Sequence, residues 1–561
     1  MLARHSQKIL LIVAGIFFLV YAWPTITVTW PAMRAHGGYY ISSWPDSMAN
    51  YFFTGRLANN NSLSYDEPLN IFANDAVQPR SVNVFNHNIV PTGFVGFILI
   101  AGVLAKLLGL YAILLITPLL AVLAVLAFFG LVKRLYNERV AWLAALLLFT
   151  LPPFWYYASL PMLPNVLFLS LVIIAYYFYF KQAKACDYRG LVSGLLFGLA
   201  LIIRPMEFVW LGVLMVAPLF FYREHFKIKR VLVFMAGVLL PIIILLAVNQ
   251  KLYSNAFYTG YLNLEPTKGD SVITRLPPAL RTNLSAWLAF PKLILAPFGL
   301  HPRLILHNLN AYWWQLLWPW CVLFIAALLI GWRRLKTDKL TRGLMVYWWT
   351  AVLAGVCLII YYGSWLFDDQ LTLRLNTIGI SYVRYWLPLY VLVLPFIAYG
   401  LEQVTQRNPL GFVFSKILGM TAHTPSKTKL VGLVLVFVLL LGFSWWTVYL
   451  KSGDGLRDQA QVTRDSYQLL DEVKAQVNKE AVIVCDREDK ILFPAYSVVV
   501  FNNNYLVWPG VKNIVGKRPV YYLTRASDVE INALNERLKE FKINLKMFSK
   551  VNEEFTLYSL K

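Results

Sequence analysis

Long apolar runs recur along most of this chain and leave few folds open to it. Within the first 450 residues, eleven runs approach or exceed the roughly 20 residues that a helix needs to cross a bilayer. They lie at 9–30, 89–108, 110–132, 140–158, 162–181, 190–222, 231–249, 312–332, 343–363, 383–402 and 429–450. Only 14% of the residues are charged, whereas soluble domains carry about 25%. We therefore expect an all-α polytopic membrane domain with additional interfacial helices.

The excess of basic residues and the small number of cysteines bear on which other classes of protein this chain could belong to. The formal net charge is +22, but Lys and Arg gather in short segments between the apolar runs, as is typical of cytoplasmic loops. This distribution disfavours nucleic acid as a partner. Cys186, Cys321, Cys357 and Cys485 are far apart in sequence, so neither a disulfide framework nor zinc spacing is indicated.

The basic clusters also predict which segments lie outside. The basic N-terminus is expected to be cytoplasmic, which places residues 31–88 outside. The pair Lys133-Arg134 should be cytoplasmic again, so only one of the runs 89–108 and 110–132 can cross. The first of these contains a proline, three glycines and a lysine, and we expect it to lie along the outer interface.

The loops between the remaining runs then alternate between the cytoplasmic and the outer side, provided that the long run 190–222 forms two short helices. Arg204-Pro205 then emerges outside, and the total is about eleven crossings. This topology predicts an integral plasma (inner) membrane protein with a cytoplasmic N-terminus and an extracytoplasmic C-terminus.

The composition changes after residue 450, and we expect domains at 1–450 and 451–561. Residues 461–479 are typical of an amphipathic helix, and 529–541 of a second helix. The β-rich stretches 481–485, 497–501 and 519–524 predict strands, followed by one or two more. These elements indicate a small extracytoplasmic α/β domain, which we expect to pack on the membrane domain or bind a partner.

The first acidic residue, Asp46, follows the first apolar run in the stretch Trp44-Pro45-Asp46-Ser47. Taken alone it suits the N-cap of an interfacial helix or a solvated loop acid. The predicted topology places it on the same side as several other ionisable residues, and we therefore take Asp46 as the candidate general base.

Three basic residues are candidates for binding a phosphate on that side. Arg204 interrupts an apolar run and Arg384 opens another, and the guanidinium fork suits phosphate. Snorkelling from a helix end would explain Arg204 equally simply, and interfacial anchoring would explain Arg384. His87 is either a phosphate partner or an ordinary surface histidine.

Other polar residues on the predicted outer side could contact a sugar or an acceptor. The segment 250–311 mixes aromatic rings with polar donors, which suits sugars but also describes a membrane-surface loop, and it contains Tyr261 and His301. The pair Asp368-Asp369 could bind a divalent cation, although a solvated pair explains it as well. No metal site is otherwise indicated.

In their order and sidedness, these features resemble the GT-C membrane glycosyltransferases, in particular the family 39-like branch of protein O-mannosyltransferases and lipid A aminoarabinose transferases. The resemblance covers residues 1 to about 450. It implies that Asp46, in Trp-Pro-Asp-Ser-x-x-x-Tyr ending at Tyr51, is the catalytic base, and that Arg204 binds a lipid phosphate. Asn165 stands where the family commonly has a second acid. Asn165 and Tyr51 thus join the candidate acceptor or sugar contacts.

The resemblance implies inverting transfer of a sugar from a polyprenyl-phosphate donor to an acceptor hydroxyl of a protein, lipid or glycan. A transporter or flippase of lipid-linked sugars is the alternative from another class, and it would favour polar residues near mid-membrane and inverted repeats. A lipid-linked glycan polymerase or ligase would share the lipid-phosphate leaving group. A divalent cation is possible but is not supported by the residues.

Overall fold

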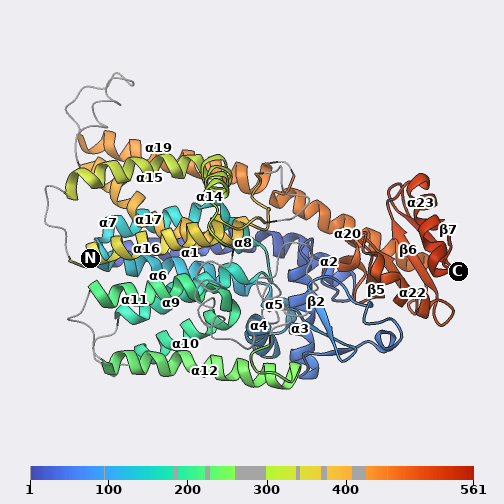
Figure 1. The fold of residues 1–561 in the computed structure, drawn as a ribbon. Coiled ribbons are helices and arrows are strands. Elements are labelled where there is room, and N and C mark those ends of the chain that lie inside the picture. Colours follow the sequence, from blue (N-terminus) through green and yellow to red (C-terminus); the bar gives the residue numbers. More distant parts are fainter. Residues whose placement is uncertain are drawn as a thin grey trace. The chain divides into compact units, whose positions relative to one another are not determined.

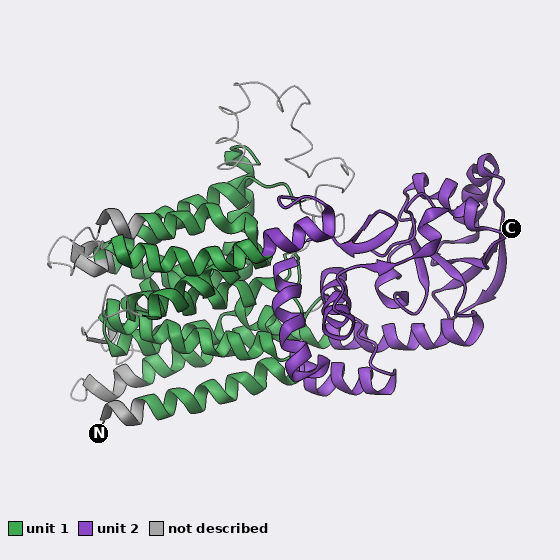
Figure 2. Cartoon of the chain, turned by 90° about the horizontal axis from the view of Figure 1, so that it is seen from below, with its two compact units in different colours: residues 1–23, 115–244, 266–458 green, residues 24–114, 245–265, 459–561 purple. Residues whose placement is uncertain are grey.

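The structure is a computed structural model that describes most of the 561 residues. The described ranges are 2–93, 95–181, 188–221, 228–258, 298–335, 342–367, 376–406, 425–451 and 453–561. Two compact units form within the chain (Figure 2). Unit 1 combines residues 1–23, 115–244 and 266–458, and unit 2 combines residues 24–114, 245–265 and 459–561.

Unit 1 is a bundle of long apolar helices (Figure 1). Its helices are α1 (Leu2–Pro24), α6 (Ile116–Leu135), α7 (Glu138–Thr150), α8 (Pro152–Ser159), α9 (Pro164–Lys181), α10 (Tyr188–Ile203), α11 (Phe208–Phe221), α12 (Ile228–Tyr253), α14 (Pro302–Leu309), α15 (Leu316–Leu335), α16 (Arg342–Gly363), α17 (Val383–Gln406) and α19 (Pro425–Trp445). The last residues of α12 belong to unit 2. Short π-helical turns η1 (Thr25–Thr29), η7 (Asn310–Gln315) and η8 (Trp446–Leu450) adjoin α1, α15 and α19.

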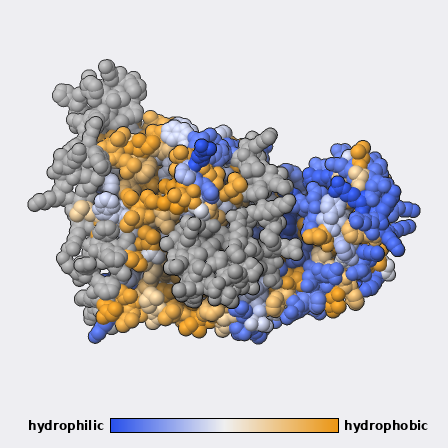
Figure 3. Space-filling view, viewed as in Figure 1, coloured by the Kyte–Doolittle hydropathy of each residue, from blue (hydrophilic) through white to orange (hydrophobic). Residues whose placement is uncertain are grey.

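The exposed surface of these helices is hydrophobic, as a lipid-facing bundle requires. Large apolar side chains on α12, α15 and α19 are more than half exposed, among them Ile243, Leu329 and Leu439. Figure 3 shows hydrophobic side chains over the bundle and mostly hydrophilic ones over the C-terminal sheet. The chain is thus an integral membrane protein, and the predicted polytopic helical fold is confirmed.

Among the described residues, eight helices are long and apolar enough to cross a membrane, or ten if each of two bent pairs counts as one span. Those pairs are α7–α8, bent by 55°, and α10–α11, bent by 115°. The second pair confirms that the run 190–222 forms two helices. A total of eleven crossings requires α10 and α11 each to cross the membrane separately, and this stays a prediction.

Unit 2 begins with α2 (Trp30–Ala35), α3 (Pro45–Asn60), α4 (Val95–Leu108) and α5 (Leu110–Ile113). A small antiparallel sheet lies between α3 and α4 in sequence, with β3 (Asn88–Pro91) paired to both β1 (Tyr65–Asp66) and β2 (Val82–Phe85). The predicted interfacial run 89–108 is thus a strand followed by a 14-residue helix, too short for a regular span.

The C-terminal part of unit 2 is a five-stranded sheet in the order β5-β4-β6-β8-β7. The strands are β4 (Val482–Cys485), β5 (Ser497–Val500), β6 (Val520–Thr524), β7 (Leu545–Lys550) and β8 (Thr556–Leu560), of which β4 pairs in parallel with β5 and β6. The helices are α20 (Leu456–Gln476), α21 (Asp489–Leu492), α22 (Trp508–Ile514) and α23 (Asp528–Leu538), the last begun by a Ser527–Glu530 capping box. The predicted strands and both helices are therefore present, whereas the boundary at residue 450 stays a prediction.

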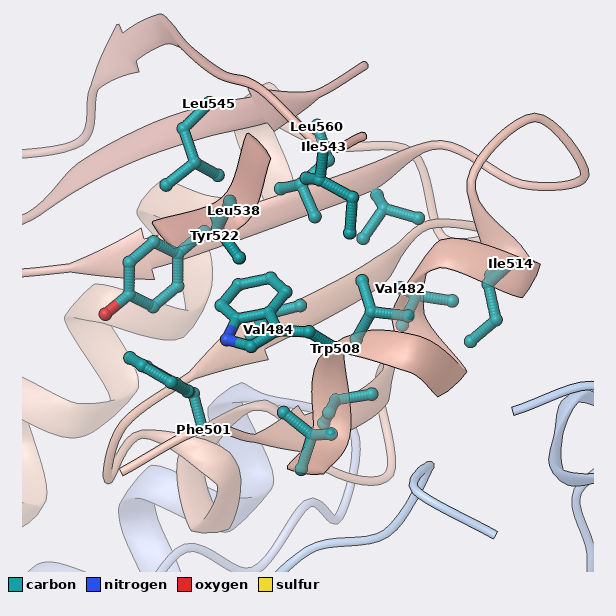
Figure 4. Close-up of a cluster of buried hydrophobic side chains, with 14 of the residues drawn as sticks. Val482, Val484, Phe501, Trp508, Ile514, Tyr522, Leu538, Ile543, Leu545 and Leu560 are labelled. Carbon is teal, nitrogen blue, oxygen red and sulfur yellow. The ribbon is translucent and has the colours of Figure 1, made fainter. Parts of the chain in front are cut away.

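Residues 67–81 of the first polar segment form part of this C-terminal fold. Ala73 and Val77 are fully or almost fully buried in the same hydrophobic cluster as Trp508 of α22 and Val499 of β5. Figure 4 shows the centre of that cluster around Trp508. Val77 also bridges to Val499, and β5 is the edge strand of the sheet. Residues 67–81 thus cover an edge that would otherwise expose unpaired backbone groups.

Gly510 allows this segment to approach α22 closely. A Cβ at Gly510 would lie 2.1 Å from the carbonyl oxygen of Ala73, so Gly510→Ala must push the segment away. We expect a loss of about 1–3 kcal/mol in stability, as for overpacked cores, and faster trypsin cleavage after Arg80. Gly442→Ala on α19, where a Cβ would meet nothing within 4 Å, is the matched control. Equal cleavage rates in the two variants would contradict this account.

Candidate active site

Asp46 lies in the first turn of α3. Trp44 is the N-cap residue and Pro45 is the first helical residue, so Asp46 is not the capping residue considered from the sequence. Its Oδ1 accepts a hydrogen bond of 2.7 Å from the Ser81 hydroxyl, which comes from the segment before β2. The Ser81 hydroxyl thus holds one carboxylate oxygen of Asp46 at the N-terminal end of α3. Asp46 is half-buried, which leaves it accessible to an acceptor.

Aromatic rings pack beside this turn. The Tyr40 and Ser47 hydroxyls are hydrogen-bonded at 2.7 Å, and the rings of Tyr40 and Tyr51 lie 4.6 Å apart between centroids. Tyr51 is buried, one helical turn after Ser47. The predicted sugar contact Tyr51 thus helps to form the wall beside the Asp46 turn.

A second cluster surrounds Arg204 in unit 1, at the break between α10 and α11. Arg204 is the N-cap of the 3₁₀ turn η3 (Pro205–Glu207), where the helices bend by 115°. Its Nε donates to Glu207 Oε1 at 2.8 Å, and the ion pair measures 2.7 Å, with both side chains buried. The structure therefore differs from simple snorkelling, because the guanidinium is held inside the protein by a carboxylate.

Arg384 belongs to the same cluster. The Tyr385 ring contacts both arginines, with its centroid 4.8 Å from the Arg204 guanidinium carbon and 5.5 Å from that of Arg384. The amide of Asn165, at the start of α9, donates to the Arg384 carbonyl at 3.4 Å. Three predicted site residues, Arg204, Arg384 and Asn165, are thus brought together from three helical regions.

A chain of hydrogen bonds holds Glu207 in place. The Tyr362 hydroxyl donates to Glu207 Oε1 at 2.7 Å, and Trp210 Nε1 donates to the other oxygen. The Tyr382 hydroxyl donates in turn to the Tyr362 carbonyl and accepts from the Asn308 amide at 3.1 Å. The cluster thus brings two buried guanidinium groups together, and the guanidinium fork suits an anionic ligand.

The remaining predicted residues make other contacts or lie outside the described residues. His87 is exposed at the β2–β3 turn, and its Nδ1 is 2.8 Å from an Asp75 oxygen, a carboxylate that would repel phosphate. His301 is exposed at the start of α14, with its backbone amide donating to Ser364 Oγ at 3.3 Å. Tyr261, Asp368 and Asp369 lie outside the described residues. Within the described ranges, no group of three or more His, Cys, Asp or Glu side chains could hold a metal ion.

Sequence reasoning missed several partners of the predicted residues. The charge-compensating role of Glu207 had a signal, because an acid three residues after Arg204 in an apolar run is unusual and can pair with it. Ser81, Tyr362 and Asn308 had none, since their partners lie 35 to 155 residues away in sequence.

Comparison with known proteins agrees with the fold and with the resemblance predicted from the sequence. Residues 94–249 match the family model described as dolichyl-phosphate-mannose-protein mannosyltransferase. The structure is similar to ArnT from Cupriavidus metallidurans bound to undecaprenyl phosphate, with a TM-score of 0.51 and 11% identity over 99% of this chain and 97% of that chain. It is also similar to the archaeal oligosaccharyltransferase AglB from Archaeoglobus fulgidus, in complex with an inhibitory peptide and a dolichol-phosphate, with a TM-score of 0.51 and 12% identity over 94% of this chain and 70% of that chain. No curated protein sequence matches this chain.

Proposed function

We propose that this chain is a membrane glycosyltransferase of the GT-C type and that it transfers a sugar from a polyprenyl-phosphate donor to an acceptor hydroxyl on the outer face of the membrane. The observation that carries the proposal is the buried pair Arg204 and Arg384, which both contact the Tyr385 ring, with Arg204 at the break between α10 and α11. A lipid phosphate is the anion that reaches such a place, because its apolar tail can remain among the helices. The structures of ArnT and AglB to which the chain is similar each contain a polyprenyl phosphate.

In the proposed reaction, Asp46 acts as general base. Its carboxylate takes the proton of the acceptor hydroxyl while the hydroxyl oxygen attacks the anomeric carbon. The bond from that carbon to the phosphate oxygen breaks, and the phosphate leaves with the bonding electrons. A single displacement of this kind inverts the anomeric configuration. The residue at the position of a second family acid is Asn165, whose amide does not accept a proton at neutral pH, so the proton transfer rests on Asp46.

Arg204 and Arg384 stabilise the departing phosphate. Negative charge grows on the leaving oxygen as the bond breaks, and fixed cations in a buried place stabilise it without having to reorganise. Glu207 keeps Arg204 in position through their ion pair, and Arg384 supplies the second guanidinium for the phosphate. We leave His87 out of the phosphate site because of its contact with Asp75.

The proposal is tested with purified full-length protein in lipid nanodiscs. Radiolabelled undecaprenyl-phosphate hexoses and aminopentoses are offered with peptide, lipid and glycan acceptors. Sugar appearing on an acceptor, with release of one undecaprenyl phosphate for each sugar, is the expected result. In a parallel reconstitution into sealed vesicles, movement of the donor across the bilayer without transfer would instead indicate a flippase, and extension of a glycan on its lipid carrier would indicate a polymerase.

A further inference from the structure

The turn that follows β4 in the C-terminal sheet contacts the residue next to Ser81. The Asp489 carboxylate accepts from the Arg80 backbone amide and from its Nε, both at 2.8 Å, and forms an ion pair of 2.7 Å with the guanidinium. The Arg487 carbonyl accepts a further hydrogen bond of 2.6 Å from Arg80. Asp489 is completely buried. One side chain of the C-terminal fold thus fixes both the main chain and the side chain of Arg80.

Ser81 has a backbone conformation that such a contact can maintain. Its φ angle is +62°, in the left-handed region, which costs a serine on the order of 1 kcal/mol unless the surroundings impose it. Asp489 holds the residue before Ser81, and Val82, the residue after it, is the first residue of β2. The Ser81 hydroxyl is thereby directed at Asp46 Oδ1, 2.7 Å away.

The same turn also contacts the chain just before α3. The ammonium of Lys490 donates to the Ser43 carbonyl at 2.6 Å, three residues before Asp46. The pKa of Lys490 is lowered to about 8, mainly by burial and also by the neighbouring Arg80 and Arg487, against the opposing effect of Asp489 and Glu488. A lysine placed at that energetic cost, with its ammonium directed at the main chain, constrains the position where α3 begins.

We propose that Asp489 and Lys490 are positioning residues for the Asp46 carboxylate, so that the C-terminal α/β fold serves the active site directly. Asp489 acts through Arg80 and Ser81, and Lys490 acts through the backbone of Ser43. The inference rests on the proposed role of Asp46, and it assigns to the C-terminal fold a role in orienting the base. It revises the sequence-based expectation that this part serves only for packing or partner binding.

The ionisation of Asp46 can be measured without a substrate. Full-length protein in nanodiscs is treated with a water-soluble carbodiimide, which reacts with protonated carboxyl groups, and labelling at Asp46 is followed by peptide mass spectrometry from pH 3 to pH 8. Ser81→Gly removes the hydroxyl and accepts the left-handed backbone. Because a lost donor disfavours the charged carboxylate, the labelling midpoint should rise by about one pH unit.

Asp489→Asn should raise the same midpoint, and combining it with Ser81→Gly should add little, since both act through one hydrogen bond. Arg80→Lys is a second variant that keeps a cation beside Asp489 and loses the two-point contact, and it should move the midpoint in the same direction. Glu480→Gln removes an exposed ion pair of 2.5 Å with Arg518 in the same fold and should leave the midpoint unchanged.

Unchanged midpoints in Asp489→Asn and Arg80→Lys, or full additivity with Ser81→Gly, would overturn the positioning role. A second readout separates this from failure of the proposed function. If Asp46→Asn still transferred sugar at the wild-type rate, Asp46 would not be the base. If Asp46→Asn were inactive and Asp489→Asn kept both the wild-type midpoint and the wild-type rate, only the present inference would fail.

Discussion

Asp46→Asn is expected to reduce sugar transfer about 10³-fold while leaving binding of the donor lipid unchanged. The amide is nearly the same size as the carboxylate and can still accept from Ser81, so the start of α3 should keep its shape. What it loses is the ability to take a proton, and general-base catalysis typically contributes 10²–10⁴-fold. The expected signature is a fall in kcat with the KM for the polyprenyl-phosphate sugar nearly unchanged.

Asp66→Asn is the matched control for this substitution. Asp66 is an exposed acid of the same polar segment, in β1, and it should retain at least half of the wild-type rate. The measurement is transfer of radiolabelled sugar by the two variants at equal protein concentration, with thermal unfolding followed in parallel. An Asp46→Asn enzyme that kept more than a tenth of the activity would rule out Asp46 as the base.

Local signals in the sequence predicted the elements well, because each signal acts over a few residues. The run 190–222 reads as two helices because an arginine and a proline interrupt it, and the structure bends there by 115°. The strands at 482–485 and 520–524 follow from short β-branched runs bounded by polar residues. The grouping of Arg204 with Arg384 was predicted only as far as membrane sidedness allowed, and the contact of both with the Tyr385 ring was not anticipated.

Contacts between distant segments carry no comparable signal. Arg80 and Asp489 are 409 residues apart, and in sequence each reads as an ordinary surface charge. The same holds for Val77, whose place in the core of the C-terminal fold depends on a strand edge more than 400 residues later. Such pairs follow from tertiary packing, which periodicity and composition do not encode. For this reason the first polar segment and the C-terminal fold were predicted as separate parts, although they share one compact unit.

The charge balance around Arg204 decides which arginine gives the clearer test of phosphate binding. Removing Arg204 alone would leave the buried Glu207 carboxylate without its cation, and breaking such a pair costs about 3–5 kcal/mol in stability. A loss of activity in Arg204→Gln would therefore mix misfolding with lost binding. The double substitution Arg204→Gln with Glu207→Gln removes both charges and avoids that ambiguity.

Arg384→Gln should lower kcat/KM for the donor by about 10²–10³-fold, because it removes one of the two guanidinium groups proposed to stabilise the departing phosphate. The specific readout is competition by undecaprenyl phosphate and by undecaprenol, which share the tail and differ in the phosphate. Wild-type protein should bind the phosphate much more tightly than the alcohol, and Arg384→Gln should lose most of that preference while binding the alcohol as before. Arg303→Gln, an exposed arginine on α14, is the control and should keep the preference. If Arg384→Gln distinguished phosphate from alcohol as well as the control does, the lipid phosphate would have to bind elsewhere.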